Sequence, residues 1–164
     1  PRSTLFPYTT LFRSERCERV PGFRMYFLAM NVTFKPFGNK LVRQAFNYAV
    51  DPHVIIKHIF DGNGTVLNGP LSSNMIGHDP NTKRYPHDPK KARELLAQAG
   101  YPGGLEVKLN YAPDRHLKGK DVCQVLASQL AKAGVKVELV SQEYAVYWGK
   151  DGVNGGKTAF YYAG

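Results

Sequence analysis

Two spacings of apolar residues alternate along this chain and predict helices and strands in turn. Segment 39–50 has apolar residues at positions i, i+3, i+4 and i+7, the spacing of a helix with one buried face. The residues expected on this face are Val42, Ala45, Phe46 and Ala49. The same spacing predicts a helix over 119–133, whereas strict alternation of apolar and polar residues predicts strands over 105–111 and 135–141.

Asp–Pro pairs predict where two further helices begin. Asp51 and Asp88 each precede a proline, which places a capping carboxylate before a residue suited to the first helical turn. Two glycines that follow an apolar stripe, Gly100 and Gly134, predict where helices end. The helix after Asp51 is expected to direct four side chains to the core: Val54, Ile55, His58 and Ile59.

The remaining segments complete an α/β order. Segment 23–32 is rich in aromatic and β-branched residues, which predicts a buried strand. Segment 65–87 has no period and many Gly and Pro residues, so we expect a long loop there. A short helix over 142–150 and a strand over 157–163 follow. The fold class is therefore α/β, with a βαβ unit at 105–141 whose crossover is expected to be right-handed.

The first fourteen residues, PRSTLFPYTTLFRS, have no amphipathic period that continues into the chain. They also lack the apolar run and cleavage site of a signal peptide. One back-translation of them matches a common short-read sequencing adaptor over every codon. We therefore interpret residues 1–14 as translated adaptor rather than a structured domain, and 15–164 as a fragment of a longer protein. Any signal peptide is then expected to lie outside this sequence.

Composition narrows the classes of partner. Without residues 1–14 the chain loses Arg2 and Arg13, so its formal charge falls from +9 to +7 over 150 residues, a length that supports one buried core. The lysines and arginines are dispersed, which argues against nucleic acid as a partner. Cys17 and Cys123 form neither a disulfide framework nor a CxxC pair, and Cys123 is expected in the core.

The motifs of common enzymes are absent from this sequence, including GxSxG, HExxH and the P-loop. Four residues offer nitrogen and carboxylate ligands of the kind that suit zinc: His78, Asp79, His87 and Asp88. Turns and helix caps explain the Asp–Pro pairs among them more simply, so we predict no metal and no cofactor. The GNG stretch at 62–64 is interpreted as a turn after a helix rather than a phosphate loop.

Three stretches together resemble one protein family: PFGNKLVRQAFNYAVDPHVIIKHIFDGNGTVLNGP, YPHDPKKARELLAQAGYPGG and LASQLAKAGVKVEL. In combination they resemble the extracytoplasmic solute-binding proteins of peptide- and nickel-type ABC importers, family 5 of the bacterial extracellular solute-binding proteins. The resemblance covers about 23–164, and most of its residues cap, end or pack helices. The matching positions are Asn31, Val42–Ala45, Ala49–Asp51, Gly62–Gly64, Tyr85, Asp88–Gly100 and Gly134–Val135.

The resemblance implies a partial lobe of a periplasmic-binding-protein-like fold. In full-length members two α/β lobes close around the ligand, and residues 15–164 would be part of the C-terminal lobe. The hinge, the first lobe and the end of the second lobe would lie outside this sequence. In the family, the strand that matches 157–163 is often followed by Gly-Trp and an Asp that meets the ligand amine. This sequence ends at Gly164, so that feature is not available as a test.

The resemblance also supplies a candidate ligand contact. The stretch NYAPDRH at 110–116 matches a P-x-R loop that faces the ligand cleft in the family. Arg115 offers a planar fork of donors suited to a peptide carboxylate, and Tyr111 is expected to line the same cleft. A surface arginine, or one engaged in a salt bridge, fits the sequence equally well.

Together these features predict the substrate-binding component of an ABC importer, which captures a peptide or similar small solute and passes it to ABC permease subunits. No enzyme activity is expected. The expected location is the periplasm, either free or lipid-anchored outside the cytoplasmic membrane. Two alternatives stay open at this point: an α/β metal-dependent enzyme fragment, and a cytosolic regulator that senses a solute with the same lobe.

Overall fold

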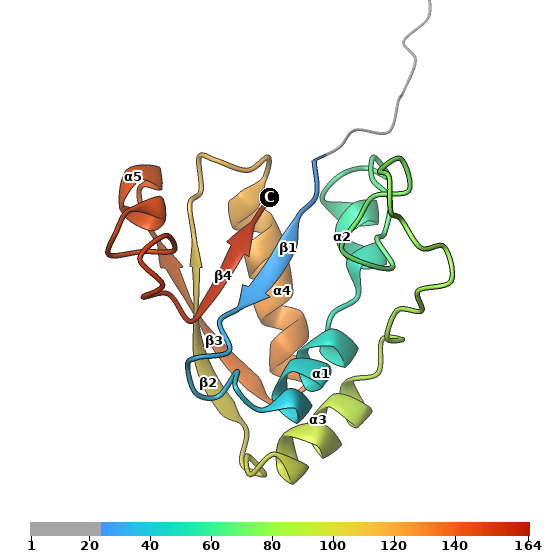
Figure 1. Ribbon diagram of the computed structural model, residues 1–164. Coiled ribbons are helices and arrows are strands. Elements are labelled where there is room, and N and C mark those ends of the chain that lie inside the picture. The colour runs from blue at the N-terminus through green and yellow to red at the C-terminus, as the bar shows by residue number, and fades with distance from the viewer. Residues whose placement is uncertain (1–23) are drawn as a thin grey trace, which may run out of the picture.

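The computed structural model describes residues 24–164, which form a four-stranded mixed sheet with helices packed against it (Figure 1). The predicted order of elements is confirmed, and strands 105–111 and 135–141 have the predicted bounds. Segment 1–14 and Cys17 lie outside the described residues. The elements are β1 (Phe27–Met30), α1 (Lys40–Ala49), α2 (Pro52–His58), α3 (Pro89–Gln98), β2 (Leu105–Tyr111), α4 (Gly119–Lys132), β3 (Val135–Ser141), α5 (Tyr144–Trp148) and β4 (Phe160–Ala163).

The sheet has the strand order β1-β4-β2-β3, and three of its strands run parallel. β2 pairs in parallel with β3 along its whole length and with β4 at Asn110 and Tyr161. β1 pairs with β4 in the antiparallel sense, from Phe27 opposite Ala163 to Met30 opposite Phe160. The β2-α4-β3 segment is the predicted βαβ unit, and β4 lies between β1 and β2 although it follows them in the sequence.

One hydrophobic core lies between the sheet and the helices. α4 packs against β2 and β3, α1 lies beside α4, and α3 packs on α1 (Figure 1). On the opposite face of β2 and β3, facing residues form exposed ion pairs, Glu106 with Lys136 at 2.7 Å and Lys108 with Glu138 at 3.4 Å. The alternate residues of β2 that enter the core are Leu105, Val107, Leu109 and Tyr111.

The helix ends form at the predicted capping residues. The Asp51 and Asp88 carboxylates each accept a hydrogen bond from a backbone N–H in the first turn that follows, at 3.0 and 2.9 Å. After α3 and α4, Gly100 and Gly134 have φ angles of 95° and 86°, in the left-handed region that favours glycine. These residues therefore end the helices without strain.

The buried side chain of Gln129 ties α4 to the beginning of α2. Its Oε1 accepts a hydrogen bond from the Asp51 backbone N–H at 2.9 Å, and its Nε2 donates to the Asp51 carbonyl at 3.1 Å. Both ends of the amide thus have backbone partners, which offsets the cost of burying a polar group. The contact fixes the distance between the two helices at the residue that caps α2.

The predicted core face of α2 is wrong for two of its four residues. Ile55 is buried and Ile59 is half-buried, but Val54 is 39% exposed and His58 is also exposed. Val54 and His58 lie one turn apart on a stripe rotated about 100° from the Ile55 stripe. The helix has only seven residues and packs along one stripe, so the neighbouring stripe faces solvent.

β1 is shorter than its predicted range of 23–32, of which residue 23 lies outside the described residues. It is also not the buried strand expected, because Phe27 is 53% exposed and the other three residues are half-buried. Pairing covers Phe27–Met30 only, because the chain turns at Asn31. The Asn31 side-chain oxygen accepts hydrogen bonds from the Thr33 N–H at 3.1 Å and from the Thr33 hydroxyl at 2.7 Å. This local bonding satisfies the backbone in a turn and ends the strand early.

Candidate functional site

Three strands end at one edge of the sheet, because β2, β3 and β4 run parallel. We call this the carboxyl edge and define it by residues 24–26, 59–63, 111–118, 141–144 and 162–164. It lies at the top of Figure 1, where β1 also begins because it runs in the opposite direction. In open α/β sheets ligands bind outside the carboxyl ends of the strands, so this edge is where a ligand site is expected.

Arg115 lies on the loop that follows β2 and is exposed at the carboxyl edge. Its guanidinium carbon lies 5.4 Å from the centroid of the Tyr144 ring, within range of a cation–π interaction. Tyr144 begins α5, so this contact joins the ends of β2 and β3. Among residues 24–164, Arg115 forms no ion pair with a carboxylate. Its charge and its donors are therefore available to an anionic group from outside.

Tyr111, the second residue expected at the ligand cleft, is placed differently. It is the last residue of β2, and its side chain is 5% exposed and packs in the hydrophobic core. Its backbone carbonyl accepts a hydrogen bond from the Gln142 N–H at 3.0 Å, which joins the segments that follow β2 and β3. Tyr111 thus supports the carboxyl edge from beneath, while Arg115 lies on its surface.

Four rings from four segments form a cluster at the carboxyl edge, which we call the aromatic cluster: Tyr26, Phe60, His116 and Tyr162. The His116 ring stands edge-on to Tyr26 and Tyr162, with centroid distances of 5.5 and 5.2 Å. Tyr26 also stacks on Tyr162 at 5.8 Å and on Phe60 at 6.3 Å. Sequence reasoning missed this cluster, although the position of His116 directly after Arg115 was a usable signal.

His116 is buried without hydrogen-bond partners. Its side chain is 3% exposed, and neither ring nitrogen has a partner among the residues that the structure describes. Burial lowers the pKa of His116 below its ordinary value of 6.5, and the nearby positive charges of Arg115 and Arg24 lower it further. The Tyr162 hydroxyl is similarly buried and unpartnered, and burial raises its pKa. The aromatic cluster therefore favours a neutral imidazole.

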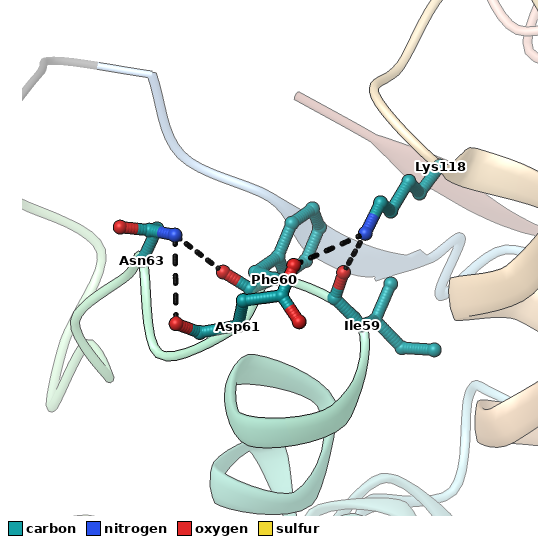
Figure 2. Close-up of polar contacts among 5 residues, drawn as sticks. All are labelled: Ile59, Phe60, Asp61, Asn63 and Lys118. Carbon is teal, nitrogen blue, oxygen red and sulfur yellow. Dashed lines mark hydrogen bonds and ion pairs between the residues drawn. The ribbon is translucent and has the colours of Figure 1, made fainter.

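A lysine bridges the carboxyl edge, and we call this contact the Lys118 bridge (Figure 2). The Lys118 ammonium donates a hydrogen bond to the carbonyl of Ile59, the residue after the last turn of α2, and lies 3.7 Å from the Asp61 carboxylate. On the other side of this turn, the Asn63 amide donates to the Phe60 carbonyl at 2.9 Å. The bridge connects the loop after β2 to the end of α2.

The residues considered for zinc do not come together. Within 24–164 there is no group of three or more His, Cys, Asp or Glu side chains placed to hold a metal ion. Asp79 bonds within its own turn and Asp88 caps α3, as their positions before prolines indicate. His87 instead lines an open hollow of about 660 Å³ with His53 and Arg84, between α2 and the long loop.

One further side chain is accounted for by packing, and one further motif by a turn. Cys123 is fully buried in α4, and burial raises the pKa of its thiol to about 12, so it stays protonated and unreactive. The 62–64 stretch is the turn after α2, where the Gly62 N–H bonds the Ile56 carbonyl at 2.9 Å and φ of Gly62 is 77°. The interpretation of this stretch as a helix-ending turn is confirmed.

Comparison with known proteins identifies the family. Residues 6–164 match the family described as bacterial extracellular solute-binding proteins, family 5 Middle. The chain belongs to this family. The match begins inside segment 1–14, so the interpretation of that segment as translated adaptor stays a prediction.

Relatives and solved structures agree with this assignment. The chain is 42% identical over 123 residues to the glutathione-binding protein GsiB of Pectobacterium atrosepticum and 37% identical over 129 residues to heme-binding protein A of Haemophilus influenzae. These matches cover 75% and 77% of this chain but 24% of each relative, so the chain spans about a quarter of their length. The periplasmic binding protein DppA of Helicobacter pylori, solved with the peptide STSA, superposes with a TM-score of 0.76 and 31% identity, over 84% of this chain and 26% of that one.

Family 5 membership bears on one of the two alternatives left open by the sequence. The family consists of substrate-binding proteins of ABC importers and not of enzymes, so the alternative of a metal-dependent enzyme fragment is set aside. The predicted α/β, periplasmic-binding-protein-like fold is confirmed by the superposition on DppA. Within residues 24–164, no helix has the length and apolar character that crossing a bilayer requires.

Proposed function

We propose that the protein containing this family 5 chain captures a peptide or similar small solute and delivers it to the permease of an ABC importer. In this proposal residues 15–164 form part of the C-terminal lobe, and the carboxyl edge faces the ligand cleft. The observation that carries the proposal is Arg115, an exposed arginine at the carboxyl edge of a family 5 sheet with no carboxylate partner in residues 24–164.

Arg115 is the proposed contact to the ligand carboxylate. A guanidinium binds a carboxylate through two parallel N–H···O bonds, which fixes the orientation of the ligand as well as its charge. The Arg115 guanidinium carbon lies 5.4 Å from the centroid of the Tyr144 ring, and the side chain is exposed, so its N–H donors are accessible to a ligand. Tyr111 takes part indirectly, because its side chain is buried in the hydrophobic core and its backbone carbonyl accepts a hydrogen bond from the Gln142 N–H.

Peptides are the ligand class we favour. The relative named for glutathione binding and the DppA structure with the peptide STSA both involve ligands with peptide bonds and free carboxylates. The relative named for heme binding widens the range of possible solutes, but heme also carries carboxylates. A carboxylate is thus the group that these ligands share and that Arg115 would recognise.

Delivery to a permease requires that the lobes close around the ligand, because contacts to both lobes favour the closed state. A chain that carries one part of one lobe lacks most of those contacts. We therefore propose that this chain alone binds peptides weakly or not at all. The location that fits this function is the periplasm, either free or attached by a lipid outside the cytoplasmic membrane.

The test begins with the complete reading frame that contains these residues, recovered from the source DNA and expressed as one protein. Calorimetry against glutathione, a dipeptide and a tetrapeptide is expected to show binding of at least one of them. Arg115→Leu is expected to weaken that binding roughly a hundredfold, because it removes a charge-assisted bidentate contact. The control is Arg93→Leu, since Arg93 is exposed on α3, away from the carboxyl edge. Binding of a neutral sugar but of no peptide would overturn the proposal.

A further inference from the structure

We infer that Lys118 is a positioning residue for ligand binding: the Lys118 bridge holds the 112–118 loop so that Arg115 is presented to the ligand carboxylate. This inference rests on the proposed function, because it deepens the role given to Arg115. Lys118 itself does not contact the ligand in this scheme. It acts through the backbone of the loop on which both residues lie.

The backbone at both ends of the Lys118 bridge is strained. Lys118 and Asp61 each have a φ of 52°, and they are the two non-glycine residues with positive φ in residues 24–164. The left-handed region is unfavourable for residues with a Cβ, so such residues persist where the surrounding structure holds them. That the two strained residues lie in contact with each other indicates that one arrangement holds both.

Lys118 is also an unusual residue for its place at the beginning of α4. Helices usually begin after an extended residue whose short side chain caps the first turn, such as Ser or Asp. Lys118 is left-handed and makes no such capping bond, so its side chain is directed elsewhere. It is directed across the carboxyl edge, to the end of α2 (Figure 2).

The geometry of the contact suits a lysine. The Ile59 carbonyl follows the last turn of α2, where the helix dipole concentrates negative charge, and the ammonium donates to it. The Asp61 carboxylate is 80% exposed, so this ion pair alone contributes little to stability. The bridge therefore matters less for the stability of the fold than for the path of the loop.

The loop is held at a second point beside Arg115. His116 is buried between Tyr26 and Tyr162, and its carbonyl accepts a hydrogen bond from the Gly119 N–H at 3.0 Å. Arg115 is thus followed directly by a residue that is fixed inside the aromatic cluster. The Lys118 bridge lies two residues after His116. If the bridge is lost, the 112–118 loop is no longer held against the end of α2, and the part of it that carries the Arg115 guanidinium can shift about the remaining attachment at His116.

The experiment compares two ligands in the complete protein described above: a peptide it binds and the same peptide with an amidated C-terminus. Lys118→Met keeps the length of the side chain but removes its charge and donors. It is expected to weaken binding of the free-carboxylate peptide roughly tenfold and binding of the amide less than twofold. Lys118→Arg, which can still donate to Ile59, is expected to restore most of the affinity. The control Lys120→Met, exposed two residues along on α4, is expected to change neither ligand.

A double-mutant cycle separates positioning from a general structural role. With Arg115→Leu in place, adding Lys118→Met is expected to cause no further loss for the free-carboxylate peptide, because the loop then has nothing to position. Equal weakening of the acid and amide peptides by Lys118→Met would overturn the inference. If Lys118→Met does not fold, Asp61→Asn is the second variant, with a smaller loss confined to the acid peptide expected.

The two proposals fail in different ways. If Arg115→Leu leaves the preference for the free carboxylate unchanged, the proposed ligand contact is wrong, and the positioning role falls with it. If Arg115→Leu removes that preference but Lys118→Met behaves like Lys120→Met, only the positioning role is overturned. Every outcome of the series therefore decides at least one of the two.

Discussion

The end of the fold opposite the carboxyl edge differs from that edge in its backbone and in its buried polar groups. We call it the base and define it by Asp51, residues 88–105 and residues 129–135. At the base, where the chain needs a left-handed backbone to end a helix, it has glycine at 100 and 134. At the carboxyl edge Asp61 and Lys118 also have a left-handed backbone, beside Gly62, and they are the two non-glycine residues in residues 24–164 that do. At the base, the oxygen and the nitrogen of the buried Gln129 amide both have hydrogen-bond partners. At the carboxyl edge, His116 is buried and neither of its ring nitrogens has a partner among the described residues.

This difference matches the proposed division between residues that build the fold and residues at the proposed ligand site. A folded chain ordinarily agrees with local rules everywhere except where function requires a departure. The buried side-chain atoms without partners in residues 24–164 belong to His116, Gln142 and Tyr162, all at the carboxyl edge. The strain and the unpaired polar atoms thus gather at the edge where a solute-binding protein would meet its ligand.

The largest effect on stability is expected when a leucine is replaced by alanine at the base, and the same replacement at the carboxyl edge serves as the comparison. Leu130 is fully buried in α4, so Leu130→Ala should lower the free energy of unfolding by about 3 kcal/mol, through lost burial and a cavity. Leu117 at the carboxyl edge is 66% exposed, and Leu117→Ala should change it by less than about 0.5 kcal/mol. Chemical denaturation measures both, and similar values for the two variants would remove the distinction between the regions.

The next effect concerns the buried amide of the base. Gln129→Leu leaves the Asp51 N–H and carbonyl without partners, which should lower the free energy of unfolding by about 2 kcal/mol. Gln124→Leu, at an exposed position of the same helix, is the control and should change stability by less than about 0.5 kcal/mol. A neutral result for Gln129→Leu would mean that water replaces the lost bonds at no cost.

A pH-dependent effect is expected from His116. Because its pKa is lowered in the folded protein, the unfolded chain takes up a proton first as pH falls through about 6.5, and stability declines. Above that pH the imidazole is neutral in both states and contributes no pH dependence. His116→Phe keeps an aromatic ring in the cluster but cannot be protonated. Its stability should therefore decline less than that of the parent between about pH 7 and about pH 5. Parallel curves for the two proteins would contradict this assignment.

The smallest effect tests the strain at the carboxyl edge. Asp61→Gly relieves an unfavourable left-handed backbone and loses only an exposed ion pair, so stability should rise by about 0.5 kcal/mol. The same kind of change in a regular helix, Ala97→Gly in α3, should lower stability by about 0.5–1 kcal/mol. Chemical denaturation should therefore show that the free energy of unfolding rises for Asp61→Gly and falls for Ala97→Gly. A fall for both variants would show that the backbone at Asp61 is not strained.

The base was predictable from sequence because its signals are local. Capping by Asp51 and Asp88, the glycine stops and the alternation of β2 each depend on neighbouring residues, and each was found where the sequence places it. The exposed stripe of α2 was predicted wrongly, because the packing of a two-turn helix depends on which neighbours cover it. Local spacing cannot supply that information.

The carboxyl edge was predictable only in part. Arg115 could be singled out by resemblance to a family loop, but the aromatic cluster joins segments that the sequence separates by up to about 140 residues. The Lys118 bridge depends on a left-handed lysine, which no spacing rule indicates. Its strained partner, Asp61, lies in a turn that the sequence presents as ordinary.

The place of β4 between β1 and β2 has a consequence for how the chain is made. A growing polypeptide would release β1 before the other described elements, yet the only strand paired with it in the described sheet is β4, which is synthesised after the other elements of residues 24–164. Until Phe160–Ala163 emerge, β1 has an unsatisfied edge, and β2 and β3 can associate only with each other. Pairing across such a separation in sequence is slow, because a large loop must close before any contact rewards it. The four described strands can therefore join into one sheet only after β4 has been made, when β4 pairs with β1 on one side and with β2 on the other.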